Sequence, residues 1–170
     1  MSINTGSVLG LTTQWSEIET DPLSVNNMVS DVGNISYNLT YTSGTGSGQI
    51  DQIFHVNNYL SGTTADIYDM TGAVNTIFNK SVSTPFSKIK SVTIENVSGD
   101  AVEVIVHGSN GFSEPFGTPA TGIPLDPSGY LHINTTGDGW VVDSTNRLIT
   151  IGNDATDNNV VYEMLILGEA

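Results

Sequence analysis

The sequence predicts an all-β protein, an antiparallel, jelly-roll-like β-sandwich of about eight or nine short strands. Short segments alternate apolar with polar residues, and turn residues separate them at intervals of roughly 8 to 12 residues. Only 13% of the 170 residues are charged, so the chain is poor in the Lys, Glu and Arg that favour surface helices. No internal repeat suggests a propeller or a solenoid.

The amino-terminal part is predicted to differ from the rest. Residues 1–34 are expected to form an irregular arm with little regular structure, because Asp21-Pro22 interrupts any continuous element. Residues 35–170 are expected to form a single β-sandwich domain. This domain opens with the clearest alternation in the chain, at residues 35–42, and a glycine-rich turn at residues 44–48 follows.

The middle of the chain predicts a central hairpin. Two strands are expected at residues 50–59 and 63–70, and residues 73–83 form either a short strand or a loop. Residues 86–97 and 101–107 are both rich in β-branched residues, and Ser98-Gly99-Asp100 between them has the composition of a tight hairpin turn. The apolar alternation of the first strand changes parity near Lys90-Ser91, which predicts a β-bulge there.

After the predicted hairpin the chain becomes irregular and then returns to strands. Residues 108–127 contain four glycines and four prolines, which predicts a long, ordered surface loop and makes it the first candidate for a contact surface. In the carboxy-terminal strand both alternating sets of residues are mostly apolar, so it is expected to be central in a sheet. The strands predicted here are residues 129–133, 140–143, 147–152 and 159–167.

Charge and composition exclude several classes of partner. Four basic against 18 acidic residues give a net charge of −14, which opposes binding to nucleic acid and to anionic membranes. The chain has no cysteine, no signal-like leader and no apolar run long enough to span a bilayer. Lys80, Lys88 and Lys90 form the one basic cluster, and they either contact acidic patches on neighbouring copies or protect an edge strand.

The sequence contains no pattern that clearly indicates a catalytic or metal-binding site. His55, His107 and His132 lie on three different predicted strands without the spacing of a zinc site, so ordinary strand histidines are favoured. The Asp- and Asn-rich residues 154–159, with Asp138 and Asp143, suit turns better than calcium loops. We therefore expect no catalytic, cofactor-binding or metal-ligating residues, and we expect that the chain is not an enzyme.

Residues 38–170 resemble a family of small structural proteins encoded by tailed phages. The marks are Gly-Thr-Gly-Ser-Gly-Gln ahead of Asp51-Gln52-Ile53, the F-x-K-I-K-x-V-x-I-E-N pattern of residues 86–96, the Gly-Ser-Asn-Gly-Phe turn of residues 108–112 and the hydrophobic carboxy-terminal strand. The resemblance implies a non-enzymatic β-sandwich protein of the virion that decorates or cements the capsid. It also implies binding to the major capsid protein, homo-oligomers, no cofactor, and a place on the capsid surface after synthesis in the host cytoplasm.

Three alternatives stay open. The chain could be a tail or fibre protein with a receptor or glycan contact through Trp140 and Tyr130. It could also be a free carbohydrate-binding β-sandwich module. The third alternative is a cupin-like metalloenzyme, which would need the histidines to meet in space.

Overall fold

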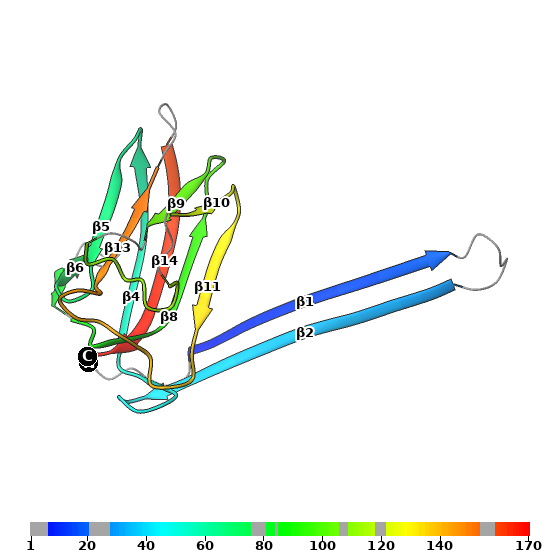
Figure 1. Cartoon of the computed structure of the whole chain (residues 1–170), viewed down its shortest axis with the longest axis horizontal. Helices are drawn as coiled ribbons and strands as arrows, with labels where there is room; N and C mark the ends of the chain where they lie inside the picture. Colours follow the sequence, from blue (N-terminus) through cyan, green and yellow to red (C-terminus); the bar gives the residue numbers. More distant parts are fainter. Residues whose placement is uncertain are drawn as a thin grey trace.

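The computed structural model shows an all-β molecule in which two antiparallel sheets pack face to face and a long hairpin projects away from them (Figure 1). The described part contains strands, turns and loops, and no helix. The β-sandwich class predicted from the sequence is confirmed, with nine strands in its two sheets, five in one and four in the other. The structure describes residues 7–20, 28–75, 81–83, 85–105, 109–117, 122–153 and 159–170.

The five-stranded sheet has the order β11-β8-β14-β4, and β12 also pairs with β8. Its strands are β4 (Gln52–Ser61), β8 (Lys88–Asn96), β11 (Tyr130–Asn134), β12 (Trp140–Val141) and β14 (Asn159–Glu169). The four-stranded sheet has the order β10-β9-β13-β5. Its strands are β5 (Ala65–Asp69), β9 (Val102–Ile105), β10 (Ile123–Leu125) and β13 (Leu148–Gly152). Two short strands, β6 (Ala73–Asn75) and β7 (Ser81–Ser83), pair separately.

The hydrophobic core fills the space between these two sheets. The carboxy-terminal strand β14 lies between β8 and β4, as predicted, and buries one complete alternating set of residues there. The facing strands β9 and β13 supply buried aliphatic residues from the other side. The residues that meet include Val160, Tyr162, Met164 and Ile166 from β14 and Val104, Ile149 and Ile151 from the four-stranded sheet.

The β-bulge predicted near Lys90-Ser91 is confirmed. Leu167 of β14 pairs with Ser91, but the next residue, Gly168, pairs with Ile89, so Lys90 is an extra residue in β8. The strands approach closely at this point: a Cβ at residue 168 would lie 2.1 Å from the carbonyl oxygen of Lys88. Glycine is therefore the residue that this bulge requires.

The predicted central hairpin is wrong, although both of its strands exist. β8 belongs to the five-stranded sheet and β9 to the four-stranded sheet, so the chain crosses between layers after Asn96. The side chain of Asn96 explains the crossing, because its Nδ2 donates to the carbonyls of Asp100 at 2.7 Å and Leu125 at 2.9 Å. Its Oδ1 also accepts from the backbone N of Ser98 at 3.0 Å. These bonds close the turn against β10 instead of joining two paired strands.

The Gly/Pro-rich segment is only partly irregular. Residues 109–117 form turns and loop, as expected, but Ile123–Leu125 is strand β10 and pairs with Val102–Val104 of β9. Pro124 is compatible with this strand because β10 is at the edge of its sheet, where one side of the backbone needs no donor. The prediction of a loop through residue 127 is wrong at this strand.

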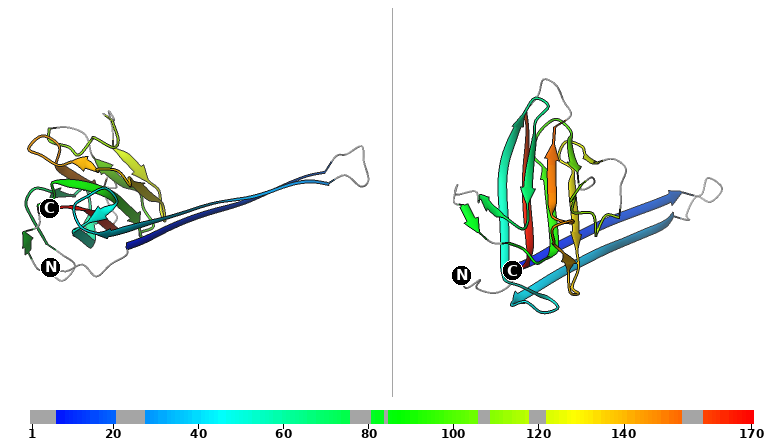
Figure 2. Two further views of the ribbon diagram at one scale, coloured as in Figure 1. Left: turned by 90° about the horizontal axis from the view of Figure 1, so that it is seen from below. Right: turned by 60° about the vertical axis from the view of Figure 1, so that its left-hand side comes forward.

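The amino-terminal arm lies outside the two sheets of the sandwich, and part of it is described. The described parts of it are β1 (Ser7–Thr20) and β2 (Met28–Ser43), which pair antiparallel from Ser7 with Tyr41 to Thr20 with Met28. Asp21-Pro22 falls in the segment that joins the two strands and so interrupts neither. The resulting ribbon extends beyond the β11 side of the sandwich in Figure 1, and Figure 2 shows it projecting from two further directions. The arm exists, but its described backbone is a regular hairpin.

Candidate functional site

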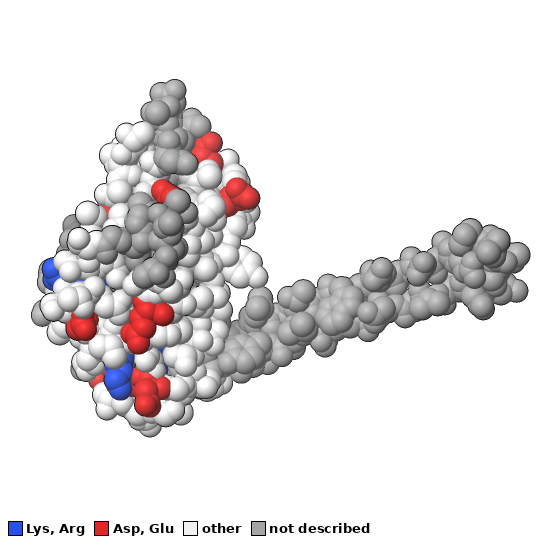
Figure 3. Space-filling model, viewed as in Figure 1, with Lys and Arg blue, Asp and Glu red and all other residues white. Residues whose placement is uncertain are grey.

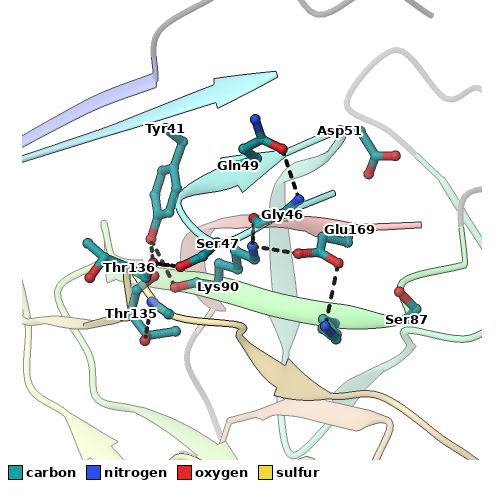
Figure 4. Close-up of polar contacts among 12 residues, drawn as sticks. Tyr41, Gly46, Ser47, Gln49, Asp51, Ser87, Lys90, Thr135, Thr136 and Glu169 are labelled. Carbon is teal, nitrogen blue, oxygen red and sulfur yellow. Dashed lines mark hydrogen bonds and ion pairs between the residues drawn. The ribbon is translucent and has the colours of Figure 1, made fainter. Parts of the chain in front are cut away.

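Buried polar contacts fasten the hairpin to one end of the sandwich (Figure 4). We call this group the hairpin base. It joins residues from four separate parts of the chain, including the end of β2, the bulge in β8 and the end of β14. Its members are Tyr41, the glycine-rich residues 44–48, Lys90, Thr135, Thr136 and Glu169.

Tyr41 anchors the hairpin to the five-stranded sheet. Its buried ring forms a small cluster with Ile50 and Leu167, and Leu165 packs beside them. Its hydroxyl lies 3.1 Å from the carbonyl oxygen of Lys90 and 3.0 Å from that of Thr135, and these two acceptors share its single proton. Tyrosine suits this position, because its ring packs against apolar side chains while its hydroxyl reaches hydrogen-bond acceptors. The contact places the start of the hairpin on the outer surface of β8 and β14.

Lys90 and Glu169 form a buried ion pair beneath this contact. The Lys90 side chain is 0% exposed, and its Nζ lies 2.5 Å from Glu169 Oε1 and 2.5 Å from the carbonyl oxygen of Gly46. The second carboxylate oxygen of Glu169 lies 3.8 Å from Nζ of Lys88. A charge this deeply buried is tolerated only when it is paired and hydrogen-bonded, and Lys90 meets both conditions.

Both readings of the lysine cluster are wrong for Lys90. The residue lies inside the protein, so it cannot contact a neighbouring copy. It also lies in β8, between β11 and β14, so it does not protect an edge. Lys88 shares the same carboxylate, and Lys80 lies outside the described residues. Lys90 is thus an internal residue of the hairpin base, and Lys88 lies beside it with a partly exposed side chain.

The glycine-rich turn closes around the ammonium group of Lys90. Gly48 has a φ of 70°, which glycine adopts without strain. The backbone N of Gly46 donates to Gln49 Oε1 at 2.9 Å, which leaves the carbonyl of Gly46 to face Lys90. Ser47 Oγ donates to the carbonyl of Thr136 at 2.9 Å. The turn therefore ties β2 to the segment that follows β11.

The end of β14 is tied down as well. The backbone N of Ala170 donates to Asp51 Oδ1 at 2.8 Å, and Ser87 Oγ donates to the carbonyl of Ala170 at 2.8 Å. The backbone N of Ser87 donates to the carbonyl of Glu169 at 2.8 Å. Glu169 is therefore held in place by its backbone as well as by the two lysines.

Three of the four sequence marks used for the resemblance meet at the hairpin base. The glycine turn with Asp51, the lysine-bearing strand β8 and the carboxy-terminal strand β14 supply its contacts. Sequence reasoning identified these segments and the bulge, but it did not identify the Lys90–Glu169 pair. One signal was present: a lysine inside an apolar strand, next to the predicted bulge.

The described histidines do not come together. His55 on β4 and His132 on β11 lie in one register row, through Leu165 and Thr93. Three strand spacings separate them, about 14 Å. His55 Nε2 contacts Glu163 Oε1 at 2.6 Å, and His107 lies outside the described residues. The arrangement gives no shared site to His55 and His132.

His132 has neutral partners on both ring nitrogens. Its Nε2 lies 2.7 Å from Asn134 Nδ2, an amide donor, so Nε2 accepts that bond. Its Nδ1 lies 2.9 Å from Thr93 Oγ1 and carries the proton of the neutral ring. Partial burial lowers the pKa of His132 below its ordinary value. The ring is consequently held neutral.

Asp143, one of the acidic residues considered for calcium binding, makes hydrogen bonds within its own turn. Asp143 Oδ1 accepts from the backbone N of Thr145 at 2.7 Å and from its Oγ1 at 2.8 Å, and these bonds lower the pKa of Asp143. Residues 154–158 lie outside the described part of the chain. Within the described residues, no three His, Asp or Glu side chains are grouped so that they could hold a metal ion.

A second polar cluster lies at the β4–β5 edge of the sandwich. The hydroxyls of Tyr68 and Tyr162 are 2.5 Å apart, and Tyr162 donates to Asp66 Oδ2 at 2.5 Å. Asn58 Nδ2 donates to the same oxygen at 2.8 Å. Burial, together with the bond to Asp66, raises the pKa of Tyr162 far above its ordinary value. The phenol stays protonated and donates to Asp66, and the cluster ties β4, β5 and β14 together.

Comparisons with known proteins add no relative: no family model, no curated protein and no solved structure matches the chain. The resemblance to phage structural proteins therefore rests on the segments quoted above. Among the described residues, the structure contains no helix with the length and apolar character needed to cross a membrane.

Proposed function

We propose that this chain is a non-enzymatic structural protein of a virus particle. In this proposal it decorates or cements the capsid shell of a tailed phage by binding the major capsid protein and copies of itself. The single observation that carries the proposal is the projecting hairpin, whose base is pinned to the sandwich by Tyr41 and by the buried Lys90–Glu169 pair.

The dimensions of the hairpin support a contact with another molecule. Each of its strands pairs over 14 residues, about 46 Å at the usual rise of a β-strand, whereas the 11 residues of β14 span about 36 Å. A two-stranded ribbon alone is only marginally stable in water. The hairpin therefore gains most of its stability when a neighbouring subunit covers it.

The fixed base supports the same proposal. A projecting element that is held at its root loses less conformational freedom on binding than a flexible tail does. The glycine turn, the Tyr41 contact and the ion pair set the direction in which the ribbon leaves the sandwich (Figure 4). A decoration protein needs this property, because it must meet its neighbours at fixed spacings on a shell.

Surface charge favours a basic partner. Lys88, Lys90 and Arg147 are all engaged with carboxylates, Arg147 through Asp69 Oδ2 at 2.6 Å. Acidic side chains are scattered over the visible face of the sandwich in Figure 3, while basic ones are few. With a net charge of −14, the protein is suited to joints in a shell that present basic residues. We place it on the capsid surface, after synthesis in the host cytoplasm.

Binding to purified particles tests the proposal. Shells that lack the protein should bind it saturably, with a fixed number of copies per shell, when the mixture is pelleted and the bound chain is quantified. Purified tails from the same particle serve as the control and should bind none. Recovery with tails and not with shells would refute the decoration role.

One observation favours a second candidate, a tail or fibre protein that binds glycans. Tyr130 is 58% exposed on β11 and offers an aromatic ring for sugar stacking. Trp140, the other residue expected to make such a contact, packs partly buried against the core and is less available. A glycan array should separate the two functions: binding that Tyr130→Ala abolishes, with no binding to shells, would favour the glycan role.

A further inference from the structure

The β4 edge of the sandwich is long and lacks the features that usually protect an edge strand. β4 is the last strand of the five-stranded sheet, and among the described residues β14 is the only strand that pairs with it. Its ten residues, QIFHVNNYLS, include no lysine, no proline and no acidic residue. Its register with β14 continues without a bulge. An edge strand of this kind can pair with a strand of another molecule.

The other edges of the two sheets are shorter or protected. β10 has three residues and contains Pro124. β5 has five residues, of which Asp66 and Asp69 are acidic. At the opposite edge of the five-stranded sheet, β11 and β12 have five and two residues. β4 is therefore the edge of the sandwich that is best suited to strand pairing.

The backbone of β4 directs a known set of hydrogen-bonding groups out of the sheet. In an antiparallel sheet, a strand between two others bonds to them with alternate residues. The backbone O of Val161 in β14 accepts from the backbone N of Val97, which directly follows β8. The even-numbered residues of β14 therefore bond to β4, and their register partners are the even-numbered residues of β4. The odd-numbered residues of β4 direct their N–H and C=O groups outward.

The exposed apolar side chains of β4 are placed symmetrically along the strand. Phe54, Val56 and Leu60 point into the core, so the odd-numbered side chains point away from it. Among these, Ile53 is 42% exposed and Tyr59 is 64% exposed. Ile53 precedes Val56 by as many residues as Tyr59 follows it. A two-fold axis at Val56 would thus place Ile53 of each copy opposite Tyr59 of the other, and a β-branched residue opposite an aromatic one is a favourable cross-strand pair.

We propose that β4 of one copy pairs antiparallel with β4 of a second copy about a two-fold axis at Val56. The two five-stranded sheets then form one continuous sheet, joined by about eight backbone hydrogen bonds from the outward-directed residues. The symmetric placement of Ile53 and Tyr59 favours a second copy over an unrelated strand, because only a second copy repeats the same spacing. The inference rests on the binding between copies that the proposed function includes, and not on a role in a virion.

The surroundings of β4 are compatible with this pairing. Two acidic residues beside the strand have partners within their own chain: Glu163 contacts His55 at 2.6 Å, and Asp66 accepts from Asn58 at 2.8 Å. The hairpin leaves the sandwich past β11, at the opposite edge of the five-stranded sheet (Figure 1). The proposed dimer therefore keeps both hairpins available for other contacts.

Sedimentation equilibrium of the full-length chain, with a matched pair of variants, tests the proposal. Tyr59→Lys places a lysine on the proposed contact, where it should block strand pairing. Tyr130→Lys is the control, because Tyr130 is 58% exposed on the same face of the sheet but lies on β11, at the opposite edge. We expect Tyr59→Lys to raise the dissociation constant of the dimer at least about tenfold, and Tyr130→Lys to change it less than about threefold.

The two variants are matched in charge and can be checked for folding. Each makes the net charge of −14 less negative by the same amount, so added long-range repulsion cannot explain a weaker dimer. Circular dichroism and urea denaturation show whether each variant folds as the wild type does. A wild-type chain that is monomeric at about 200 µM would overturn the proposal, and so would a dimer that Tyr59→Lys leaves unchanged.

Disulfide cross-linking tests the register. The chain has no cysteine, so Ile53→Cys and Tyr59→Cys can be made in separate copies, mixed and oxidised. Directly opposed residues of two antiparallel strands lie within the reach of a disulfide. We expect a covalent dimer of the two variants, and little of it when Tyr130→Cys replaces Tyr59→Cys. Equal cross-linking by Tyr130→Cys would overturn the proposed pairing.

The shell-binding experiment separates this inference from the proposed function. A chain that dimerises through β4 but does not bind shells would keep the inference and refute the decoration role. A chain that binds shells but stays monomeric in solution would keep the decoration role and refute the inference.

Discussion

Lys90, the extra residue at the bulge in β8, is a buried cation whose charge Glu169 neutralises. Their contact at 2.5 Å is almost completely shielded from water, since the two side chains are 0% and 5% exposed. Such a pair adds little net stability, because both charges lose their hydration. Removing one partner is far more damaging, because the other charge is then left buried without a counter-ion.

We predict that Lys90→Met lowers the free energy of unfolding by about 3–5 kcal/mol. The double variant Lys90→Met with Glu169→Gln should recover part of this loss, because it removes the orphaned carboxylate. Lys88→Met is the control and should cost less than about 1 kcal/mol, since that lysine is partly exposed and 3.8 Å from Glu169. Urea denaturation measures all three. A Lys90→Met protein as stable as the wild type would show that the pair is not formed.

We predict that His132 makes the free energy of unfolding depend on pH. Its pKa is lower in the folded chain than in the unfolded chain, because the fold partly buries the neutral ring. Protonation would also place an N–H of the ring opposite the amide donor of Asn134. The contribution of His132 is therefore complete above about pH 6.5 and is lost as the pH falls below that value, where the unfolded chain binds the proton first.

The measurement is the change in urea midpoint between about pH 7.5 and about pH 5.5, in the wild type and in His132→Gln. We expect the wild type to lose more stability over this interval than the variant does. The acidic residues titrate in both proteins, so their contribution cancels in the comparison. Equal losses would mean that His132 does not favour its neutral form in the folded chain.

At the scale of elements, the sandwich should fold without the length of the hairpin. Every residue of the described core cluster comes from Phe54 onward, whereas Tyr41, among the hairpin residues whose side chains are described, belongs to a separate small buried cluster. A chain that lacks residues 1–39 should therefore unfold cooperatively, within about 1 kcal/mol of the full chain. Tyr41→Ala in the full chain should lower the free energy of unfolding more, by about 3 kcal/mol, because it leaves a cavity beside Ile50 and Leu167. Denaturation followed by circular dichroism compares the two, and loss of cooperativity on truncation would contradict the expectation.

The sequence was informative about strands and less so about their partners. β11, β13 and β14 were predicted closely, because alternation is a local signal. Ser98-Gly99-Asp100 correctly indicated a turn, but Asn96 decides that the next strand joins the other sheet, and its bonds reach as far as Leu125. The pairing of β1 with β2 was missed although the strands are neighbours in the chain, because Asp21-Pro22 was interpreted as an interruption and not as part of their connection. The bulge at Lys90 was predictable from parity, whereas its partner Glu169, distant in sequence, was not.

At the scale of the whole molecule, net charge gives the two proposed contacts opposite responses to salt. Two copies that each carry −14 repel one another, so any contact between them must overcome that repulsion. Screening weakens the repulsion, so self-association should tighten between about 50 mM and about 500 mM NaCl, on the order of fivefold in the dissociation constant. Binding to a basic surface on a shell should weaken over the same interval, because there the charges attract.

Sedimentation equilibrium of the free protein and pelleting with shells measure the two responses separately. Self-association that weakens with salt would mean that opposite charges hold the copies together. Lys88, Lys90 and Arg147 are already paired with carboxylates of their own chain, so that result would contradict the expected repulsion between copies.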